Sequence, residues 1–320
     1  MKVLSLFDGI SCGQLALNRA NITVDMYYAA EIDHSAIEIT QRNYPNTIQL
    51  GNVSNIDFSK FIGDIDIIIG GSPCQDLTIA NNYRKGLVGC RSGLFWKFME
   101  AVNIIKPKYF LLENVASMSV ENQDIISNAL GVEPIYIDSK LVSAQNRRRL
   151  YWTNIPNVQQ PKDAHIVLSD ILETDRSKRL YYIDNNYPRT IKSYHLKGDI
   201  DTDYDLIVYE ATKLGYIHVN LGKCMDLSVI NSKTRRGRAM TNKSNCLLAA
   251  STNFYQYLGV DTLTGVKVIR KFTPLECERL QTLPDNYTFG PDARRYKAIG
   301  NGWTVDVIAH ILKNIEEEAE

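Results

Sequence analysis

The feature that most constrains the fold is a buried strand that stops at two glycines. An apolar run from Ile65 to Ile69 is followed directly by Gly70-Gly71-Ser72-Pro73-Cys74. A short apolar run bounded by turn residues is typical of a fully buried strand. Such a strand would hold Cys74 rigidly at the rim of a sheet, as a nucleophile requires. The alternative is that Cys74 is a small buried hydrophobe, as most cysteines are.

Apolar strand-like runs alternate with helical stretches through the first half of the chain. This order predicts an α/β fold built on a doubly wound, mostly parallel sheet. Such sheets bind ligands beyond the carboxyl ends of their strands. The predicted strands span residues 3–7, 26–30, 65–69, 109–112, 134–138 and 149–153, and the predicted helices span 13–20, 35–43 and 94–105.

The alternation of predicted strands and helices ends after about residue 160. Residues 175–265 are rich in Asp, Asn, Thr, Tyr and Lys, and they contain short alternating pieces such as 206–209. They predict a second, smaller, irregular domain of strands and loops. Helices are predicted again at 274–283 and 305–315. We expect one domain from residues 1–175 and 290–320, and a target-recognition domain from 176–289.

The last predicted helix carries Val305, Ile308, Ala309 and Leu312 on one face. A helix this short is marginal alone and needs a surface that buries its apolar face. We expect it to return to the first domain and to dock beside the first helix, near residues 15–17.

Composition excludes several classes of protein. The 320 residues carry 36 basic and 36 acidic side chains, so nucleic-acid binding requires a local basic surface. The six cysteines are scattered without a C-x-x-C pair, which predicts no disulfide framework and no metal site. No signal-peptide pattern and no apolar run of transmembrane length occurs. We therefore expect a cytoplasmic protein without a membrane partner.

A glycine-bearing loop follows the first strand, at residues 7–13. Gly9 and Gly13 would let the backbone approach a ligand closely at the start of a helix. The loop is neither a G-x-G-x-x-G fingerprint nor a P-loop. Glu31 ends the second strand about 20 residues later, where a carboxylate accepts hydrogen bonds from ribose hydroxyls. The pair favours a nucleoside cofactor without a pyrophosphate; the alternative is a structural turn.

Charged groups follow two later strands. Glu113 stands near the end of the strand at 109–112, on the sheet edge that also carries Cys74. Arg147 and Arg149 precede the strand at 149–153, and alternation places them on one face. Two arginines there could clamp a base carbonyl, a phosphate or the Glu113 carboxylate. The alternative for all three is a solvated loop position.

Five short motifs occur in one order along the chain: Phe-x-Gly at 7–9, Pro-Cys-Gln at 73–75, Glu-Asn-Val at 113–115, Gln-x-Arg-x-Arg at 145–149 and Gly-Asn-Gly-Trp-Thr-Val at 300–305. This order resembles the cytosine-5 DNA methyltransferases over nearly the whole chain outside about 160–210. Residues 70–87 and Trp303 look closest to the de novo branch of animals. Residues 213–217 are similar to segments of bacterial and phage members.

The resemblance implies a Rossmann-like domain that binds S-adenosylmethionine. Glu31 would hold the ribose hydroxyls, and Ile32 would pack on the adenine. Asn52 stands where the family usually has Asp, but its carbonyl oxygen can still accept from the adenine amino group. The implied cofactor residues are Phe7, Asp8, Gly9, Ile10, Ser11, Glu31, Ile32, Asn52, Val53, Pro73, Leu94, Asn301, Gly302 and Trp303.

The resemblance also implies methyl transfer to carbon 5 of a cytosine that leaves the DNA stack. Cys74 would attack carbon 6, Glu113 would serve ring nitrogen 3, and Arg147 and Arg149 would support them. We expect a monomer acting on double-stranded DNA. The implied DNA contacts are Gln75, Asn81, Arg84 and Lys85 in a lid, and Arg235, Arg236 and Arg238 in the basic cluster of the second region.

Two other functions compete with this prediction. An RNA cytosine methyltransferase would use the same fold, but the Cys-Phe-Thr signature of the tRNA-directed relatives is missing. A catalytically inactive regulatory paralogue would lose its cysteine or its cofactor residues. The chain keeps Cys74, Glu113, Arg147 and Glu31, which favours an active DNA enzyme.

Overall fold

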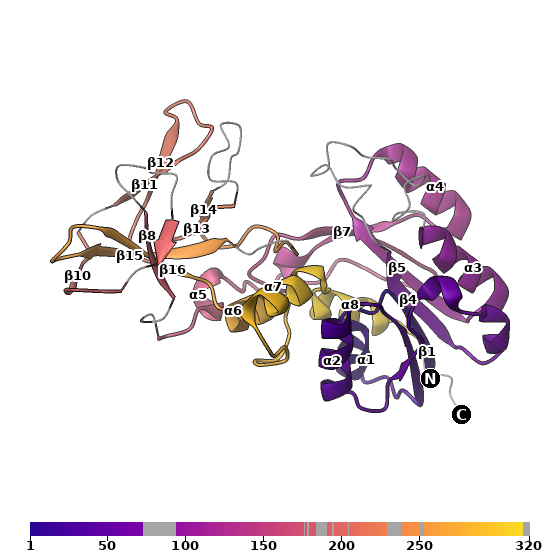
Figure 1. The fold of residues 1–320 in the computed structure, drawn as a ribbon. Coiled ribbons are helices and arrows are strands. Elements are labelled where there is room, and N and C mark those ends of the chain that lie inside the picture. Colours follow the sequence, from indigo (N-terminus) through magenta and orange to yellow (C-terminus); the bar gives the residue numbers. More distant parts are fainter. Residues whose placement is uncertain are drawn as a thin grey trace. The chain divides into compact units, whose positions relative to one another are not determined.

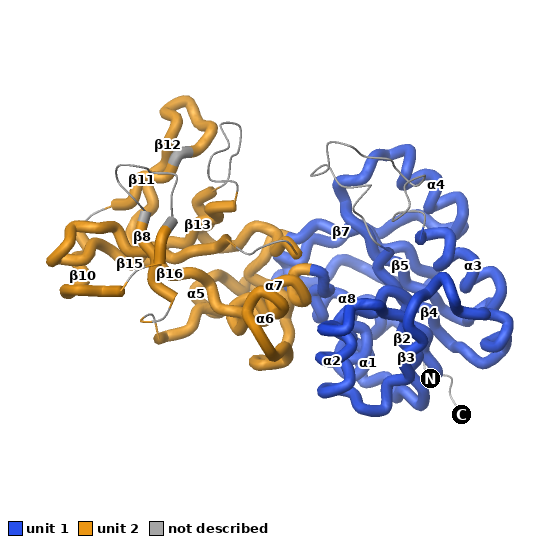
Figure 2. The backbone as a smooth tube through the Cα atoms, in the orientation of Figure 1, with its two compact units in different colours: residues 1–142, 147–164, 301–320 blue, residues 143–146, 165–300 orange. Residues whose placement is uncertain are grey.

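The chain divides into two compact units, which Figure 2 shows in different colours. The first comprises residues 1–142, 147–164 and 301–320, and the second comprises 143–146 and 165–300. The large unit is therefore discontinuous, with its boundaries at 165 and 301 where the sequence analysis expected 176 and 290. The computed structural model describes residues 1–72, 94–175, 177, 179–183, 191–193, 195–203, 205–228, 238–249 and 253–315.

The first unit is built on a seven-stranded sheet with the order β3-β2-β1-β4-β5-β7-β6 (Figure 1). Only β7 runs antiparallel to its neighbours, so the sheet is mostly parallel, as predicted. Its strands are β1 (Lys2–Leu6), β2 (Met26–Ala30), β3 (Ile48–Gln49), β4 (Ile67–Gly71), β5 (Tyr109–Val115), β6 (Ile135–Asp138) and β7 (Arg148–Thr153). Its α-helices are α1 (Cys12–Arg19), α2 (His34–Asn43), α3 (Phe95–Ile105), α4 (Val120–Leu130) and α8 (Val305–Leu312).

The apolar character of β4 and β5 explains their central place. Ile67, Ile68 and Ile69 are fully buried, and every residue of β5 is buried. Strands covered on both faces read as continuous apolar runs because neither face meets water. β1 lies between β2 and β4, so the strand order reverses there. In open α/β sheets this switch point is where ligands bind.

Helix α8 packs against α1, on the flank that the sequence analysis expected. Its apolar side chains Val305, Ile308 and Leu312 are fully buried, and Arg19 of α1 pairs with Asp306 at 2.6 Å. Residues 292–300 do not share this position, because they form most of α7 (Asp292–Asn301) and belong to the second unit. The return to the first unit thus begins at residue 301.

The second unit is mainly antiparallel sheet. Its main sheet has the order β14-β13-β15-β16-β8-β9, with β10 paired to β15, and β11 and β12 form a separate hairpin. Two of its helices, α5 (Leu168–Ile171) and α6 (Pro274–Leu280), pack together. Its strands are β8 (Leu180–Ile183), β9 (Ile191–Ser193), β10 (Ile200–Asp201), β11 (Leu206–Tyr209), β12 (Tyr216–Val219), β13 (Cys224–Asp226), β14 (Ala239–Met240), β15 (Phe254–Asp261) and β16 (Lys267–Lys271).

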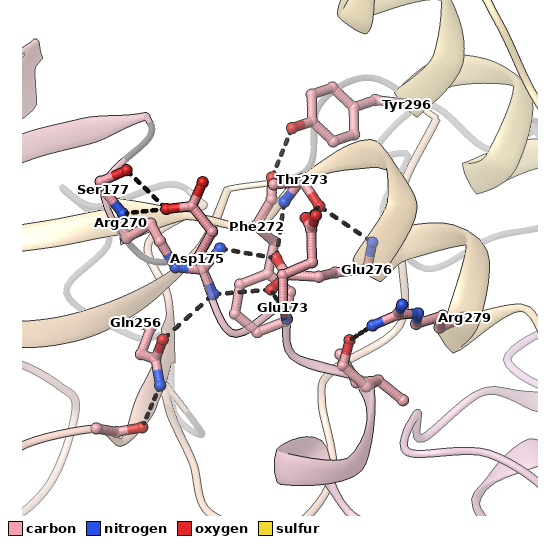
Figure 3. A network of polar contacts seen from close by, with 12 residues as sticks. Glu173, Asp175, Ser177, Gln256, Arg270, Phe272, Thr273, Glu276, Arg279 and Tyr296 are labelled. Carbon is pink, nitrogen blue, oxygen red and sulfur yellow. Dashed lines mark hydrogen bonds and ion pairs between the residues drawn. The ribbon is translucent and has the colours of Figure 1, made fainter. Parts of the chain in front are cut away.

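A buried ionic network stabilises the start of α6 (Figure 3). Glu276 is completely buried, and both of its oxygens accept hydrogen bonds from the Arg270 guanidinium, at 2.8 and 3.1 Å. The same carboxylate accepts from the backbone amides of Thr273 and Glu173. Thr273 and Glu276 form a capping box, so one carboxylate both caps the helix and neutralises Arg270.

No helix in the described part of the chain is long and apolar enough to cross a membrane. The described residues also contain no cluster of three or more His, Cys, Asp or Glu side chains suited to hold a metal ion.

Candidate active site

The loop after β1 has an unusual backbone. Phe7, Gly9 and Ser11 all have φ near +60°, the left-handed region that side chains other than glycine rarely adopt. The loop keeps this shape through Asp8, whose carboxylate accepts from the Ser11 hydroxyl and, at 2.7 Å, from the Tyr27 hydroxyl. Burial raises the pKa of Asp8 to about 6. The result is a turn fixed by hydrogen bonds at the switch point of the sheet.

Glu31 faces this loop from the end of β2. Its Oε2 accepts from the Gly9 amide at 2.8 Å, and its Oε1 accepts from the amides of Ile32 and Asp33 at 2.7 and 2.8 Å. Three backbone donors therefore fix the carboxylate before any ligand arrives. A carboxylate oriented in this way can accept the paired hydroxyls of a ribose.

The remaining predicted cofactor residues differ in accessibility. Ile32 is 68% exposed, so its side chain is free to cover a flat apolar ligand. Asn52 caps a short 3-10 helix (Val53–Asn55) by accepting from the Ser54 amide at 2.9 Å. The Val53 and Ile10 side chains are buried and contribute to the core. Leu94 is half-buried at the start of α3.

Glu113 stands next to β4 across the sheet, in register with Gly71. It is only 8% exposed. Its Oε1 pairs with Arg149 Nε at 2.6 Å, and its Oε2 accepts from Trp303 Nε1 at 3.2 Å. The structure thus brings together three predicted site residues from β5, β7 and the segment before α8. It also supplies the Arg149–Glu113 contact that the sequence left as one of several alternatives.

Arg147 takes a different partner from Arg149. Its side chain is buried, and its Nη2 donates to the backbone oxygen of Gly302 at 2.9 Å. Its amide donates to Asp138. The two arginines that were predicted to share one face therefore have different roles: Arg149 holds the Glu113 carboxylate, and Arg147 holds the C-terminal segment. Asn301, at the start of this segment, is exposed.

Sequence reasoning missed two supporting residues. Asn114 is buried and donates to the backbone oxygen of Ser72 at 3.3 Å and to its hydroxyl at 3.0 Å. It therefore ties the end of β5 to the end of β4. Gly71 lies beside the contact of Trp303 with Glu113, where a Cβ would stand 2.9 Å from the indole Nε1 and 3.0 Å from Oε2. The Gly70-Gly71 pair and the Glu-Asn-Val motif were the signals that could have identified both.

Several predicted site residues lie outside the described part of the chain. They are Pro73, Cys74, Gln75, Asn81, Arg84, Lys85, Arg235 and Arg236.

The prediction that Arg238 contacts DNA is wrong for the arrangement observed. Arg238 is completely buried, with 0% of its side chain exposed, and its Nη1 donates to the Ser228 backbone oxygen at 3.4 Å. Its amide donates to Glu210. A basic residue at the end of a charged run can be buried when carbonyl oxygens accept its hydrogen bonds. Lys243, which follows the run, likewise donates to the carbonyls of Ser143 and Ile166.

Cys12 is not a nucleophile in this arrangement. Burial raises the pKa of its thiol to about 12, although a hydrogen bond from the Trp303 backbone opposes the shift. A thiol with such a pKa is almost entirely protonated at neutral pH. Among the described cysteines, Cys224 and Cys277 are also buried. A buried free cysteine behaves as a small hydrophobic side chain, so these residues contribute to the interior.

The chain matches a family model across most of its length. The model for C-5 cytosine-specific DNA methylases covers residues 1–317. The chain is 29% identical to the orphan methyltransferase M.Rho11sI of Bacillus phage rho11s over 62% of this chain and 40% of that protein. It is 25% identical to the type II methyltransferase M.HpaII of Haemophilus parainfluenzae over 98% of this chain and 89% of that protein.

Solved structures show the same fold. The Dnmt2 methyltransferase of S. pombe superposes with a TM-score of 0.63 at 18% identity, covering 98% of this chain and 97% of that one. A putative DNA modification methyltransferase from a prophage of E. coli gives a TM-score of 0.61 at 19% identity, covering 98% of both chains. The fold, the ordered motifs and the family model agree, and the chain belongs to the C-5 cytosine-specific DNA methylase family.

Proposed function

We propose that this protein is a DNA (cytosine-5-)-methyltransferase that moves a methyl group from S-adenosylmethionine to carbon 5 of a cytosine in duplex DNA. The observation that supports this most is the placement of Glu113 beside Arg149, on the same sheet as the loop of residues 7–11 and Glu31. The loop and Glu31 suit a nucleoside cofactor, and the nearly buried Glu113 carboxyl suits a base.

The residues at the switch point fit S-adenosylmethionine. Glu31 is held in place to accept from ribose hydroxyls, Ile32 is exposed and could cover the adenine, and no atom lies within 4 Å of where a Gly9 Cβ would stand. When bound, this cofactor supplies an electrophilic methyl group on a sulfonium. The absence of a phosphate-binding loop agrees with a cofactor that carries no phosphate.

The protein's own groups would activate the base. Carbon 5 of an aromatic cytosine is a poor nucleophile, and addition of the Cys74 thiolate to carbon 6 makes the ring electron-rich there. Glu113 would hold a proton or hydrogen bond at ring nitrogen 3 as charge develops. Arg149 keeps this carboxyl oriented through the 2.6 Å contact with Oε1. Loss of the carbon 5 proton and release of Cys74 then restore the aromatic ring.

Duplex DNA is the proposed substrate because three curated relatives matched over 98% of this chain are type II methyltransferases of bacteria. A cytosine inside a duplex is inaccessible to a carboxyl in a pocket, so the base must flip out. We assign the lid role to residues 76–92 and sequence reading to the second unit, with Arg235 and Arg236 but without Arg238.

The test is expression in bacteria that lack cytosine methylation. Mass spectrometry of DNA nucleosides should detect 5-methylcytosine, and bisulfite sequencing should place it in one sequence context. Glu113→Gln should lower the rate by about 10²–10⁴-fold, the usual contribution of a general acid. Detection of 5-methylcytosine in RNA alone would replace DNA by RNA as the substrate, and its absence from both would overturn the proposal.

A further inference from the structure

The indole of Trp303 reaches the Glu113 carboxyl from the opposite end of the chain. Its Nε1–H donates to Oε2 at 3.2 Å across 190 residues of sequence. We propose that Trp303 is a positioning residue for Glu113, through which the segment beside the cofactor loop sets the geometry of the carboxyl. This inference rests on the proposed function, because it takes Glu113 to be the group that contacts the cytosine ring.

The two partners of Glu113 divide its oxygens between them. Arg149 occupies Oε1 at 2.6 Å and Trp303 occupies Oε2. A carboxylate held at one oxygen can still rotate about its last bond, whereas one held at both has a fixed plane. A fixed plane matters here because the carboxyl must meet one ring nitrogen of a planar base.

The glycine at position 71 of the sheet leaves room for the hydrogen bond between Trp303 and Glu113. Gly71 pairs with Glu113 across β4 and β5, and a Cβ at Gly71 would lie 2.9 Å from Nε1 and 3.0 Å from Oε2. Real Cβ atoms almost never approach other atoms so closely. Any side chain at position 71 would therefore crowd the indole and the carboxyl and force at least one of them to shift, whereas glycine leaves room for their hydrogen bond.

The backbone around Trp303 is anchored to the rest of the site. The Gly302 oxygen accepts from Arg147 at 2.9 Å, and the Trp303 backbone hydrogen-bonds with the thiol of Cys12. Cys12 begins α1, directly after the cofactor loop, and Val305 begins the buried helix α8. Trp303 therefore links the cofactor loop, Arg147 and Glu113 in one connected set of contacts.

A purely packing role for Trp303 makes a different prediction. The side chain is half-buried, so an indole that only lines the cofactor pocket would affect cofactor affinity and leave Glu113 unchanged. Trp303→Phe separates the two roles, since phenylalanine keeps an aromatic ring but has no N–H. Gly71→Ala provides a second route, because it keeps both the Trp303 and the Glu113 side chains but crowds the hydrogen bond between them.

The direct test observes the hydrogen bond itself. The chain has 3 tryptophans, so ¹⁵N-labelled protein gives three indole N–H resonances. Trp303→Phe identifies the resonance of interest. Replacing Glu113 by Ala should shift that resonance and leave those of Trp96 and Trp152 in place, since the Trp152 indole donates to Ser127 instead.

The functional test measures affinity and turnover separately. Trp303→Phe should leave the dissociation constant for S-adenosylhomocysteine within about two-fold and lower the single-turnover rate of methyl transfer roughly ten-fold, the scale of one hydrogen bond to a charged group. Gly71→Ala should lower the rate in the same way. The matched control is Trp96→Phe on α3, an indole that is 48% exposed and should change neither quantity.

The outcomes separate the two proposals. If the wild-type protein methylates cytosine but Glu113→Ala does not shift the Trp303 indole resonance, the positioning role is overturned and the proposed function stands. A Trp303→Phe variant that loses cofactor affinity in proportion to rate also overturns it. A wild-type protein without methyl transfer overturns the proposed function and this inference together.

Discussion

The two units use buried carboxylates in opposite ways. In the second unit, Glu276 and Glu278 are completely buried, and each accepts four hydrogen bonds. Glu276 accepts two from backbone amides and two from Arg270. Glu278 accepts two from backbone amides, one from the Thr288 hydroxyl and one from Arg295. In the first unit, Glu113 has two partners among the described residues, Arg149 and Trp303. An ionised carboxyl offers about four acceptor positions. A carboxylate whose positions are all filled holds a fold together, whereas one with free positions can meet a substrate.

The largest expected effect comes from removing Glu276, whose acceptor positions are all occupied. Glu276→Ala should lower the free energy of unfolding by about 3–5 kcal/mol, because it leaves the buried Arg270 charge without its partner. Urea unfolding followed by circular dichroism measures this. The matched control is Asp285→Ala, which removes an exposed pair with Arg279 and should cost less than about 1 kcal/mol. Equal losses in the two variants would contradict the role assigned to the network.

A smaller effect is expected at Glu31, where three backbone amides leave about one of the four acceptor positions of the carboxylate free. Glu31→Ala should weaken binding of S-adenosylhomocysteine by about 1–3 kcal/mol, since polar partners on the ligand lose their acceptor. Stability should change less, because the three donors to Glu31 are backbone amides at the surface edge of the site. Asp33→Asn is the control, a neighbouring carboxyl that caps α2 through the Ser35 amide. Calorimetry that shows unchanged affinity for Glu31→Ala would remove this residue from the ribose site.

The smallest effect concerns Asp8 and pH. Its folded-state pKa of about 6 lies above its ordinary value, so the folded protein binds a proton more tightly than the unfolded chain does. This contribution to stability is complete below about pH 4 and is lost as pH rises through about 6. Relative to Asp8→Asn, wild-type stability should fall by on the order of 1–2 kcal/mol across this range. Parallel pH profiles for the two proteins would show that Asp8 does not titrate as described.

The first unit was largely predictable because its signals are local. Glycines end the strand at Ile67–Gly71, and the predicted strands at residues 26–30 and 109–112 lie within observed ones. Helix α4 was missed because its sequence has little amphipathic pattern, with Ile126 as its main buried apolar side chain and Val120 exposed. Helix α7 was missed for a similar reason, since it is rich in charged residues and gains its place through contacts such as the Tyr296 hydroxyl to the Phe272 oxygen.

The site was predictable as a set of residues but not as a set of contacts. The motifs pointed to Glu113, Arg149 and Trp303, yet no spacing along the chain indicates that the indole donates to the carboxyl across 190 residues. For Arg238, the sequence pattern suggested a surface role that the structure does not show. A charged run is usually solvated, and only the folded structure reveals that its last arginine is buried beside Ser228.

The most direct measurement of the central claim is covalent capture on DNA. Duplexes copied from genomic DNA with 5-fluorodeoxycytidine contain the target base in every sequence context, and fluorine at carbon 5 prevents the final elimination. With S-adenosylmethionine present, the protein should form an adduct that survives denaturation and maps by mass spectrometry to Cys74, and Cys74→Ser should form none. An adduct on another cysteine, or capture on fluorinated RNA but not on DNA, would contradict the account.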